Sequence, residues 1–176
     1  MYFFNDYNYW SEEKLKLLAK AKSFEKVADI AISVLASMPT NEKISELCGP
    51  ITTGGFGDSK KNLLLFERCV LELRIQEFNP FDVSPMENKI KELEKDWRAK
   101  GNEGYCLPIL ETVYGNIFRS GFIKRAFFLP NWESSFGARW ERKTLTELGI
   151  KIYNFPEIWY QIIREELEQK FFEGPL

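Results

Sequence analysis

The chain has 176 residues, of which 44% are hydrophobic and 28% are charged, so it has the composition of one soluble, ordered protein with its own core. A net charge of −2 gives no basis for nucleic-acid binding, and no apolar run approaches the roughly 20 residues of a membrane-spanning helix, so we expect neither nucleic acid nor membrane as a partner. The absence of histidine excludes Ser-His-Asp triads, Cys-His pairs and histidine-ligated zinc, which leaves proton transfer and nucleophilic attack to carboxylates, Tyr, Lys, Ser or Cys.

The first part of the chain predicts two helices separated by a strand and a glycine-rich loop. Ser11 can cap a long helix over residues 11–38, because acids fill its first turn and apolar residues recur along it. After it, "KISELCGP" predicts a short strand, "ITTGGFGDSKK" a loop, and "NLLLFERCVLELR" a helix that Asn62 or Ser59 opens.

The middle of the chain predicts a strand and two further helices. "IQEFNP" is typical of a second strand that ends at Asn-Pro. Residues 82–104 form a charged helical insertion, in which Pro85 starts an amphipathic helix with a solvated charged face. Another helix is expected from about Pro108 to Ser120.

The last part predicts strand, helix, strand and helix in succession. "RAFFLP" is a third, buried strand, and "LPNWESSFGARWE" turns into the helix "GARWERKTLTELG", whose end is marked by Gly149. "IKIYNF" is a fourth strand, and a closing helix has Pro156 in its first turn.

Short apolar strands that alternate with helices predict an α/β fold with a parallel sheet and helices on both faces. We expect this domain over residues 41–176, after an N-terminal helical extension over residues 1–40. In such sheets ligands bind beyond the carboxyl ends of the strands. The loops expected there are "CGPITTGGFGD", "FNPFDV" and "LPNWESSFGA".

The glycine-rich loop allows backbone amides to approach an anion at the start of the next helix. It lacks the GK[ST] ending of a P-loop and does not match GxGxxG, so an ordinary flexible turn is the alternative.

The second loop of interest begins a helix with Ser135 and Gly137 and carries Glu141 about one turn inside it. A serine at a helix start can cap it, and the free amides with the positive end of the dipole can hold a phosphate. A carboxylate at Glu141 can attack an electrophilic sugar carbon. The alternative is that Ser135 only caps the helix and Glu141 only favours the helix dipole.

The N-terminal segment is rich in aromatic residues and predicts a contact, either with the rest of the chain or with a second copy in a dimer. These residues are Tyr2, Phe3, Phe4, Tyr7, Tyr9 and Trp10. The three cysteines form no CxxC motif, which favours reduced thiols and a cytoplasmic location.

Taken together, the motifs resemble the nucleoside 2-deoxyribosyltransferase-like superfamily. The resemblance covers residues 44–156, broken by the charged helix, and is most specific in "LPNWESSFGARWE". This stretch is similar to the LPxWExSxGAxxE signature of small uncharacterised, often phage-associated domains. The first loop, "CGPITTGG", is similar to the CGxI…GG loop of the 2'-deoxynucleoside 5'-phosphate N-hydrolases.

The resemblance implies a Rossmann-like, flavodoxin-like fold and cleavage of the N-glycosidic bond of deoxynucleosides or deoxynucleotides, with no metal or organic cofactor. The family's S/D-x-G-x-x-x-E pattern places the nucleophile at Glu141. Its first position is Asp in transferases that act on free nucleosides and Ser in hydrolases that prefer a phosphate. Ser135 at that position therefore implies a 5'-phosphorylated nucleotide as the small-molecule partner.

The chain departs from the family at Asn116, the nearest equivalent of an Asp that orients the sugar and helps to protonate the leaving base. An Asn side chain can hold a hydroxyl but cannot donate a proton as an acid. The alternative to an active N-glycosidase is therefore a catalytically inactive nucleotide-binding or regulatory module.

If the protein is an active N-glycosidase, the resemblance makes Glu141 and Asn116 the expected catalytic residues. The expected substrate-binding residues are Gly49, Pro50, Ile51, Thr52, Gly54, Gly55, Asn79, Ser135 and Gly137.

Overall fold

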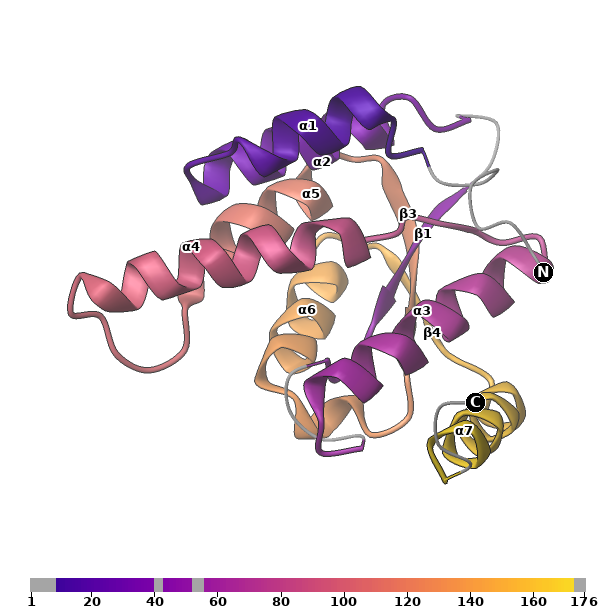
Figure 1. Ribbon diagram of the computed structural model, residues 1–176. Helices are drawn as coiled ribbons and strands as arrows, with labels where there is room; N and C mark the ends of the chain where they lie inside the picture. The colour runs from indigo at the N-terminus through magenta and orange to yellow at the C-terminus, as the bar shows by residue number, and fades with distance from the viewer. Residues whose placement is uncertain (1–8, 40–42, 52–55, 173–176) are drawn as a thin grey trace. The chain divides into compact units, whose positions relative to one another are not determined.

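The computed structural model describes residues 9–39, 43–51 and 56–172 (Figure 1). The chain divides into two compact units. We call Met1–Glu42 with Asp82–Ile123 the helical unit, and Lys43–Phe81 with Lys124–Leu176 the sheet unit. In the part of the chain that the structure describes, no helix has the length and apolar character needed to span a membrane.

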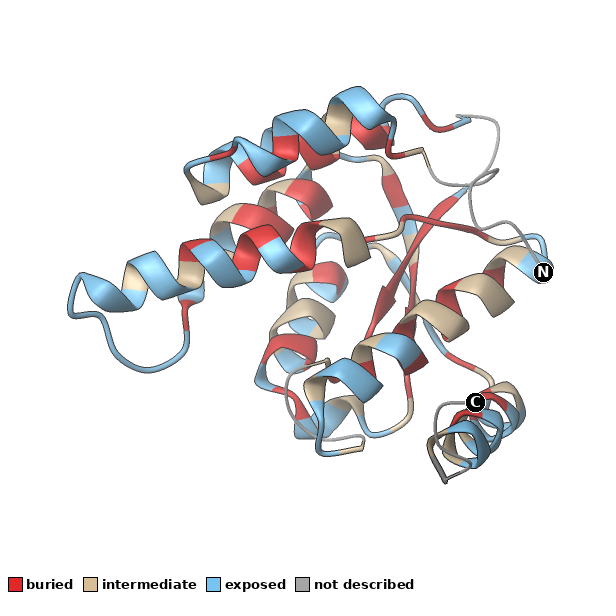
Figure 2. Cartoon of the chain, viewed as in Figure 1, coloured by how far each residue is buried: buried red, intermediate tan, exposed pale blue. Residues whose placement is uncertain are grey.

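The helical unit is built from short helices. They are α1 (Glu12–Ala19), α2 (Phe24–Leu35), the 3-10 turn η1 (Ser84–Met86), α4 (Glu87–Ala99), the π-helix η2 (Ile109–Tyr114) and α5 (Gly115–Arg119). Helix α2 is the centre of this unit, because it packs against α1, α4, η2 and α5. Figure 2 shows that α1, α2 and α4 each carry buried residues on one side and exposed residues on the other.

The prediction of one long helix over residues 11–38 is wrong, because the segment forms two helices, α1 and α2. Ser11 caps α1 as expected, and its hydroxyl oxygen accepts a hydrogen bond from the amide of Lys14 (3.2 Å). Ser23 caps α2 in the same way, with the amide of Lys26 as donor (3.2 Å). The apolar period continues through both helices, so the periodicity alone did not reveal the second cap.

The remaining predictions for this unit concern Trp10 and the charged insertion. Trp10 is buried, and its indole Nε1 donates to the carbonyl oxygen of Asp82 (2.7 Å), so this aromatic residue docks on its own unit. Tyr2, Phe3, Phe4 and Tyr7 lie outside the described residues.

The predicted amphipathic helix of the charged insertion is confirmed as η1 and α4. The charged side chains Glu87 and Lys89 are buried, however, contrary to the expected solvated face.

The sheet unit contains a parallel four-stranded sheet, which confirms the predicted α/β class. Its strands are β1 (Ile44–Cys48), β2 (Asn79–Pro80), β3 (Ile123–Phe128) and β4 (Lys151–Asn154). The strand order β2-β1-β3-β4 is that of a flavodoxin-like sheet. Because successive connections leave β1 and β3 in opposite directions, the topological switch point lies between these two strands.

The helices of this unit are α3 (Ser59–Ile75), the 3-10 turn η3 (Trp132–Ser134), α6 (Phe136–Glu147) and α7 (Glu157–Phe172). Right-handed crossovers place α3 and α6 on opposite faces of the sheet. Helix α7 packs against α3, and α6 packs against β4 and η3. Gly149 follows α6 with φ of 69°, as its predicted role at the helix end requires.

Two local predictions in this unit need correction. Asp58 caps α3, accepting hydrogen bonds from the amides of Lys60 and Lys61 (both 2.9 Å). Of the two predicted opening residues, Ser59 is the first residue of the helix but not its cap, and Asn62 lies inside the helix. The second strand is reduced to two residues, because α3 continues to Ile75 and the chain turns at Glu77 with φ of 60°.

We predict that Gly49→Ala destabilises the protein by about 1–3 kcal/mol through overpacking. A Cβ atom at residue 49 would lie 2.8 Å from Cδ1 and 2.9 Å from Cβ of Leu129. Urea unfolding of the variant measures the loss. The same substitution in a Leu129→Gly background should cost less, because the side-chain atoms of residue 129 that the added Cβ would meet are then all removed. Equal costs in both backgrounds would contradict the contact.

Candidate active site

The carboxyl ends of β1 and β3 meet at the switch point of the sheet. The backbone amide of Leu129, directly after β3, donates to the carbonyl oxygen of Cys48, the last residue of β1 (2.9 Å). Gly49 follows Cys48, and only its missing side chain leaves room for Leu129. In open α/β sheets this is where ligands bind.

A tight turn connects β3 to α6. Asn131 adopts the left-handed conformation (φ 62°), and the amide of Trp132 donates back to the carbonyl oxygen of Leu129 (3.2 Å). The amide of Ser135 then donates to the carbonyl oxygen of Trp132 (3.0 Å). The turn therefore brings the start of α6 close to the end of β3.

Ser135 caps α6, because it has an extended backbone and its hydroxyl oxygen accepts a hydrogen bond from the amide of Ala138 (3.3 Å). The Ser135 side chain is buried, and Gly137 and Ala138 in the first turn of α6 are buried as well. The first amides of an α-helix have no intrahelical carbonyl partner. The Gly137 amide belongs to this first turn, at a helix end with positive partial charge.

Glu141 is half-buried on α6 and contacts the end of β1. Its carboxylate accepts a hydrogen bond from the Cys48 thiol. Burial raises the pKa of this thiol well above its ordinary value, and the negative charges of Glu141 and Glu46 raise it further. The positive charge of Arg142 opposes this shift of the pKa. The Cys48 thiol is therefore neutral and serves as a hydrogen-bond donor.

Glu46 is a site residue that the sequence analysis did not identify. It lies in β1 with 1% of its surface exposed, two residues before Cys48. Side chains two apart in a strand point to the same face, so Glu46 and Cys48 share one face of the sheet. A charged residue in the middle of the apolar strand "ISELC" was the available signal, because carboxylates are almost never fully buried unless they are paired.

Arg142 was also not identified in the sequence. Its guanidinium carbon lies 4.9 Å from the ring centre of Phe128 and 4.4 Å from that of Trp132. Its Nη1 atom is buried and makes no hydrogen bond within the described part of the chain. Two aromatic rings thus hold a guanidinium beside Glu141 and Cys48 with one donor nitrogen unused.

The two glutamates of "LPNWESSFGARWE" have different surroundings in the structure. Glu133 is exposed in η3, and its backbone carbonyl oxygen accepts a hydrogen bond from Nη1 of Arg139. Glu133 therefore contributes to the turn through its backbone, while Glu141 faces β1.

The other predicted residues are not all found at this edge. Gly49, Pro50 and Ile51 follow β1, whereas Thr52, Gly54 and Gly55 lie outside the described residues.

Asn79 pairs with Ile44 at the amino end of β1, four residues before Cys48. At about 3.3 Å per residue it lies roughly 13 Å along the strand from the carboxyl end.

Asn116 belongs to α5 of the helical unit, where its Oδ1 accepts a hydrogen bond from Nη2 of Arg119 (3.1 Å). Gly49, Ser135, Gly137 and Glu141 all lie in the sheet unit, on the segments that follow β1 and β3.

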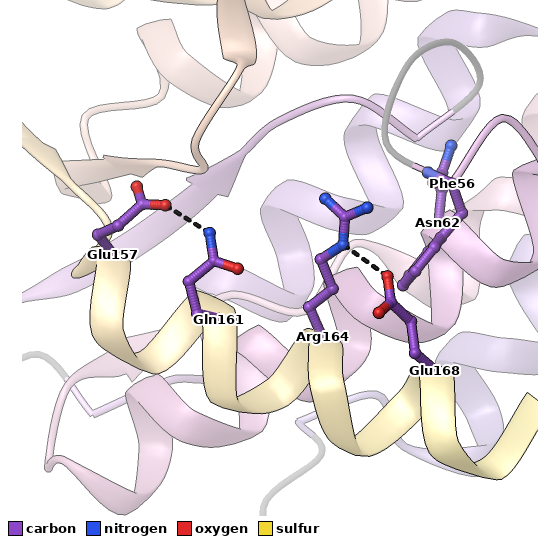
Figure 3. Close-up of polar contacts among 6 residues, drawn as sticks. All are labelled: Phe56, Asn62, Glu157, Gln161, Arg164 and Glu168. Carbon is purple, nitrogen blue, oxygen red and sulfur yellow. Dashed lines mark hydrogen bonds and ion pairs between the residues drawn. The ribbon is translucent and has the colours of Figure 1, made fainter.

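The end of the glycine-rich loop is anchored on α3 and α7. The amide of Phe56 donates to Oδ1 of Asn62, a buried residue of α3 (2.7 Å). The Phe56 ring meets Phe171 edge-on (5.7 Å between ring centres), and the Arg164 guanidinium lies 5.2 Å from its centre. Figure 3 shows that Arg164 is held by Glu168 on the next turn of α7 (2.9 Å). The loop therefore re-enters the fold at a defined position.

The described residues contain no group of three or more His, Cys, Asp or Glu side chains that could hold a metal ion. Comparisons with protein-family models, with curated proteins and with solved structures found no match. The reactive groups at this edge of the sheet are the carboxylates, the thiol and the guanidinium described above.

We predict that Glu141→Gln lowers the pKa of Cys48, because it removes a negative charge and a carboxylate hydrogen-bond acceptor. Below the pKa, the thiolate fraction increases about tenfold for each unit by which the pKa falls. Iodoacetamide labelling at pH 8–9, localised by mass spectrometry, should therefore become faster at Cys48.

Cys69 is the internal control, because burial is the main cause that raises its pKa to about 12 and Glu141 does not contribute. Equal acceleration at both cysteines would indicate local opening of the sheet unit and contradict the Cys48–Glu141 contact.

Proposed function

We propose that the protein binds nucleotides and cleaves the N-glycosidic bond of 2'-deoxynucleoside 5'-monophosphates or related nucleotides, with Glu141 as the nucleophile. The observation that carries this proposal is the position of Glu141 beside the carboxyl end of β1, at the switch point of a flavodoxin-like sheet. The resemblance of the Ser135–Gly137–Glu141 spacing to the deoxyribosyltransferase-like superfamily supports the same reaction.

In the proposed reaction the Glu141 carboxylate attacks C1' of the deoxyribose and the base leaves with the electron pair of the glycosidic bond. Water then hydrolyses the glycosyl ester and releases the sugar phosphate. The carboxylate must be ionised to act as the nucleophile. The neutral Cys48 thiol orients the carboxylate by donating a hydrogen bond to it.

The start of α6 supports recognition of the 5'-phosphate. The amide of Gly137 and the helix dipole favour an anion there. Ser135 adds no negative charge, and its hydroxyl proton remains available because its oxygen acts as the acceptor for Ala138. The unused Nη1 of Arg142 is a further donor for an anionic group.

A catalytically inactive nucleotide-binding or regulatory module is the second candidate, and Asn116 is the observation that favours it. An amide cannot supply the proton that the leaving base requires. Thermal-shift measurements with deoxynucleoside monophosphates distinguish the two. Stabilisation by a nucleotide without release of base, unchanged by Glu141→Ala, would support the inactive module.

We predict that wild-type protein releases free base from at least one of the four common deoxynucleoside monophosphates and that Glu141→Gln lowers the rate by about 10²-fold or more. Chromatography of the free base measures both. Glu133→Gln is the matched control, because this exposed glutamate lies in the same motif and should leave the rate unchanged. Equal loss in both variants, or no base release by the wild type, would contradict the proposed nucleophile.

We also predict that Ser135→Asp shifts the preference from nucleotides to nucleosides. Asp is as good a helix cap as Ser, so α6 should remain intact, but its charge repels a phosphate. The ratio of kcat/KM for a deoxynucleoside monophosphate to that for the matching deoxynucleoside should fall by roughly tenfold or more. Ser135→Asn, which caps without charge, should retain the ratio. An unchanged ratio in Ser135→Asp would place the phosphate elsewhere.

A further inference from the structure

We propose that Glu46 is the general acid and base of the reaction, which protonates the leaving base and then activates the attacking water. This inference rests on the proposed function, since it assigns a second catalytic residue to the same site. It also answers the question that Asn116 raises, because the proton donor is then supplied by the sheet unit itself.

The geometry of β1 places Glu46 on the catalytic face of the sheet. Glu46 and Cys48 alternate with Ser45 and Leu47, so the first two share a face and the second two share the other. The Cys48 thiol contacts Glu141 of α6, which shows that its face is the one that α6 covers. Glu46 therefore lies on the same side of β1 as the proposed nucleophile.

The two glutamates act on a common group. Glu141 accepts a hydrogen bond from the Cys48 thiol, and Glu46 lies close enough that its carboxylate, when ionised, raises the pKa of the same thiol, whereas the charge of Arg142 lowers it. Two carboxyl groups and a guanidinium therefore lie near one neutral thiol at the end of β1. Retaining glycosidases use such a pair of nearby carboxyl groups, one as nucleophile and one as acid and base.

Burial separates the roles of the two carboxyl groups. Glu46 is 1% exposed, whereas Glu141 is half-buried. Burial disfavours a charged carboxylate, so the fully buried glutamate is the better proton donor and the half-buried one is the better nucleophile.

The proposed steps balance in atoms and charge. A carboxylate oxygen of Glu141 forms a bond to C1', the C1'–N bond breaks, and its electron pair goes to the base, which takes the proton of Glu46. A water molecule then gives a proton to the Glu46 carboxylate and its oxygen binds C1', while the bond between C1' and Glu141 breaks. The products are the free base and 2-deoxyribose 5-phosphate, and both glutamates return to their initial states.

The test compares a substrate whose base must be protonated with one whose base need not be. Guanine in dGMP requires a proton on leaving, whereas the base of 7-methyl-dGMP is already cationic and leaves as neutral 7-methylguanine. Glu46→Gln should lower kcat on dGMP by about 10²–10⁴-fold, the usual contribution of a general acid. On 7-methyl-dGMP the first step should change by less than about tenfold, as measured by single-turnover release of base.

Three further measurements make the result decisive. Glu141→Gln should inactivate the protein towards both substrates, and Glu46→Asp should restore part of the dGMP activity because it returns an acid. The decrease of kcat/KM at high pH that a general acid produces in the wild type should be absent in Glu46→Gln. Ser45→Ala, on the opposite face of β1, is the matched buried control and should retain activity on both substrates.

Equal losses on the two substrates, with a folded Glu46→Gln protein, would show that Glu46 only supports the structure and would overturn the inference. Unchanged activity of Glu46→Gln on dGMP would overturn it as well. In both cases base release by the wild type and its loss in Glu141→Gln would leave the proposed function standing. No release from either substrate by the wild type would instead reject the proposed function, and the inference with it.

Discussion

The hydrogen bond from the Leu129 amide to the Cys48 carbonyl oxygen is the contact on which the rest of the site depends. It joins the carboxyl ends of β1 and β3, the two strands at which the direction of the connections reverses. Gly49 allows the first loop to pass Leu129 at this point. The turn at Asn131 then starts α6 immediately beside the joined strand ends.

This contact determines which residues surround the polar groups of the site. Once α6 covers the end of β1, Glu141 meets the Cys48 thiol and Arg142 is stacked on the rings of Phe128 and Trp132. Glu46 lies on the same face of β1, in a fully buried strand. Buried polar groups at a switch point are costly to maintain, and such sites are where proteins shift the protonation of side chains for chemistry.

Most of the elements could be predicted because their signals are local. Ser11, Ser135 and Gly149 mark helix ends through hydrogen bonds or backbone angles that involve only neighbouring residues. The errors arose where two local signals competed: Ser23 breaks an apolar period that continues beyond it, and α3 extends into the segment expected to form a strand. In both segments the apolar pattern was compatible with the predicted element and with the observed one. Hydrogen bonds of side chains and turns, which the apolar pattern does not reveal, decided which of the two formed.

The sequence by itself determined the α/β class, the serine cap of α6 and the absence of histidine chemistry, because these follow from short-range patterns and from residue composition. Tertiary structure alone decided the strand order, the pairing of Asn79 with the amino end of β1, and the convergence of Glu46 and Glu141 on Cys48. These depend on the register and burial of segments far apart in the chain, about which residue type and spacing carry no information.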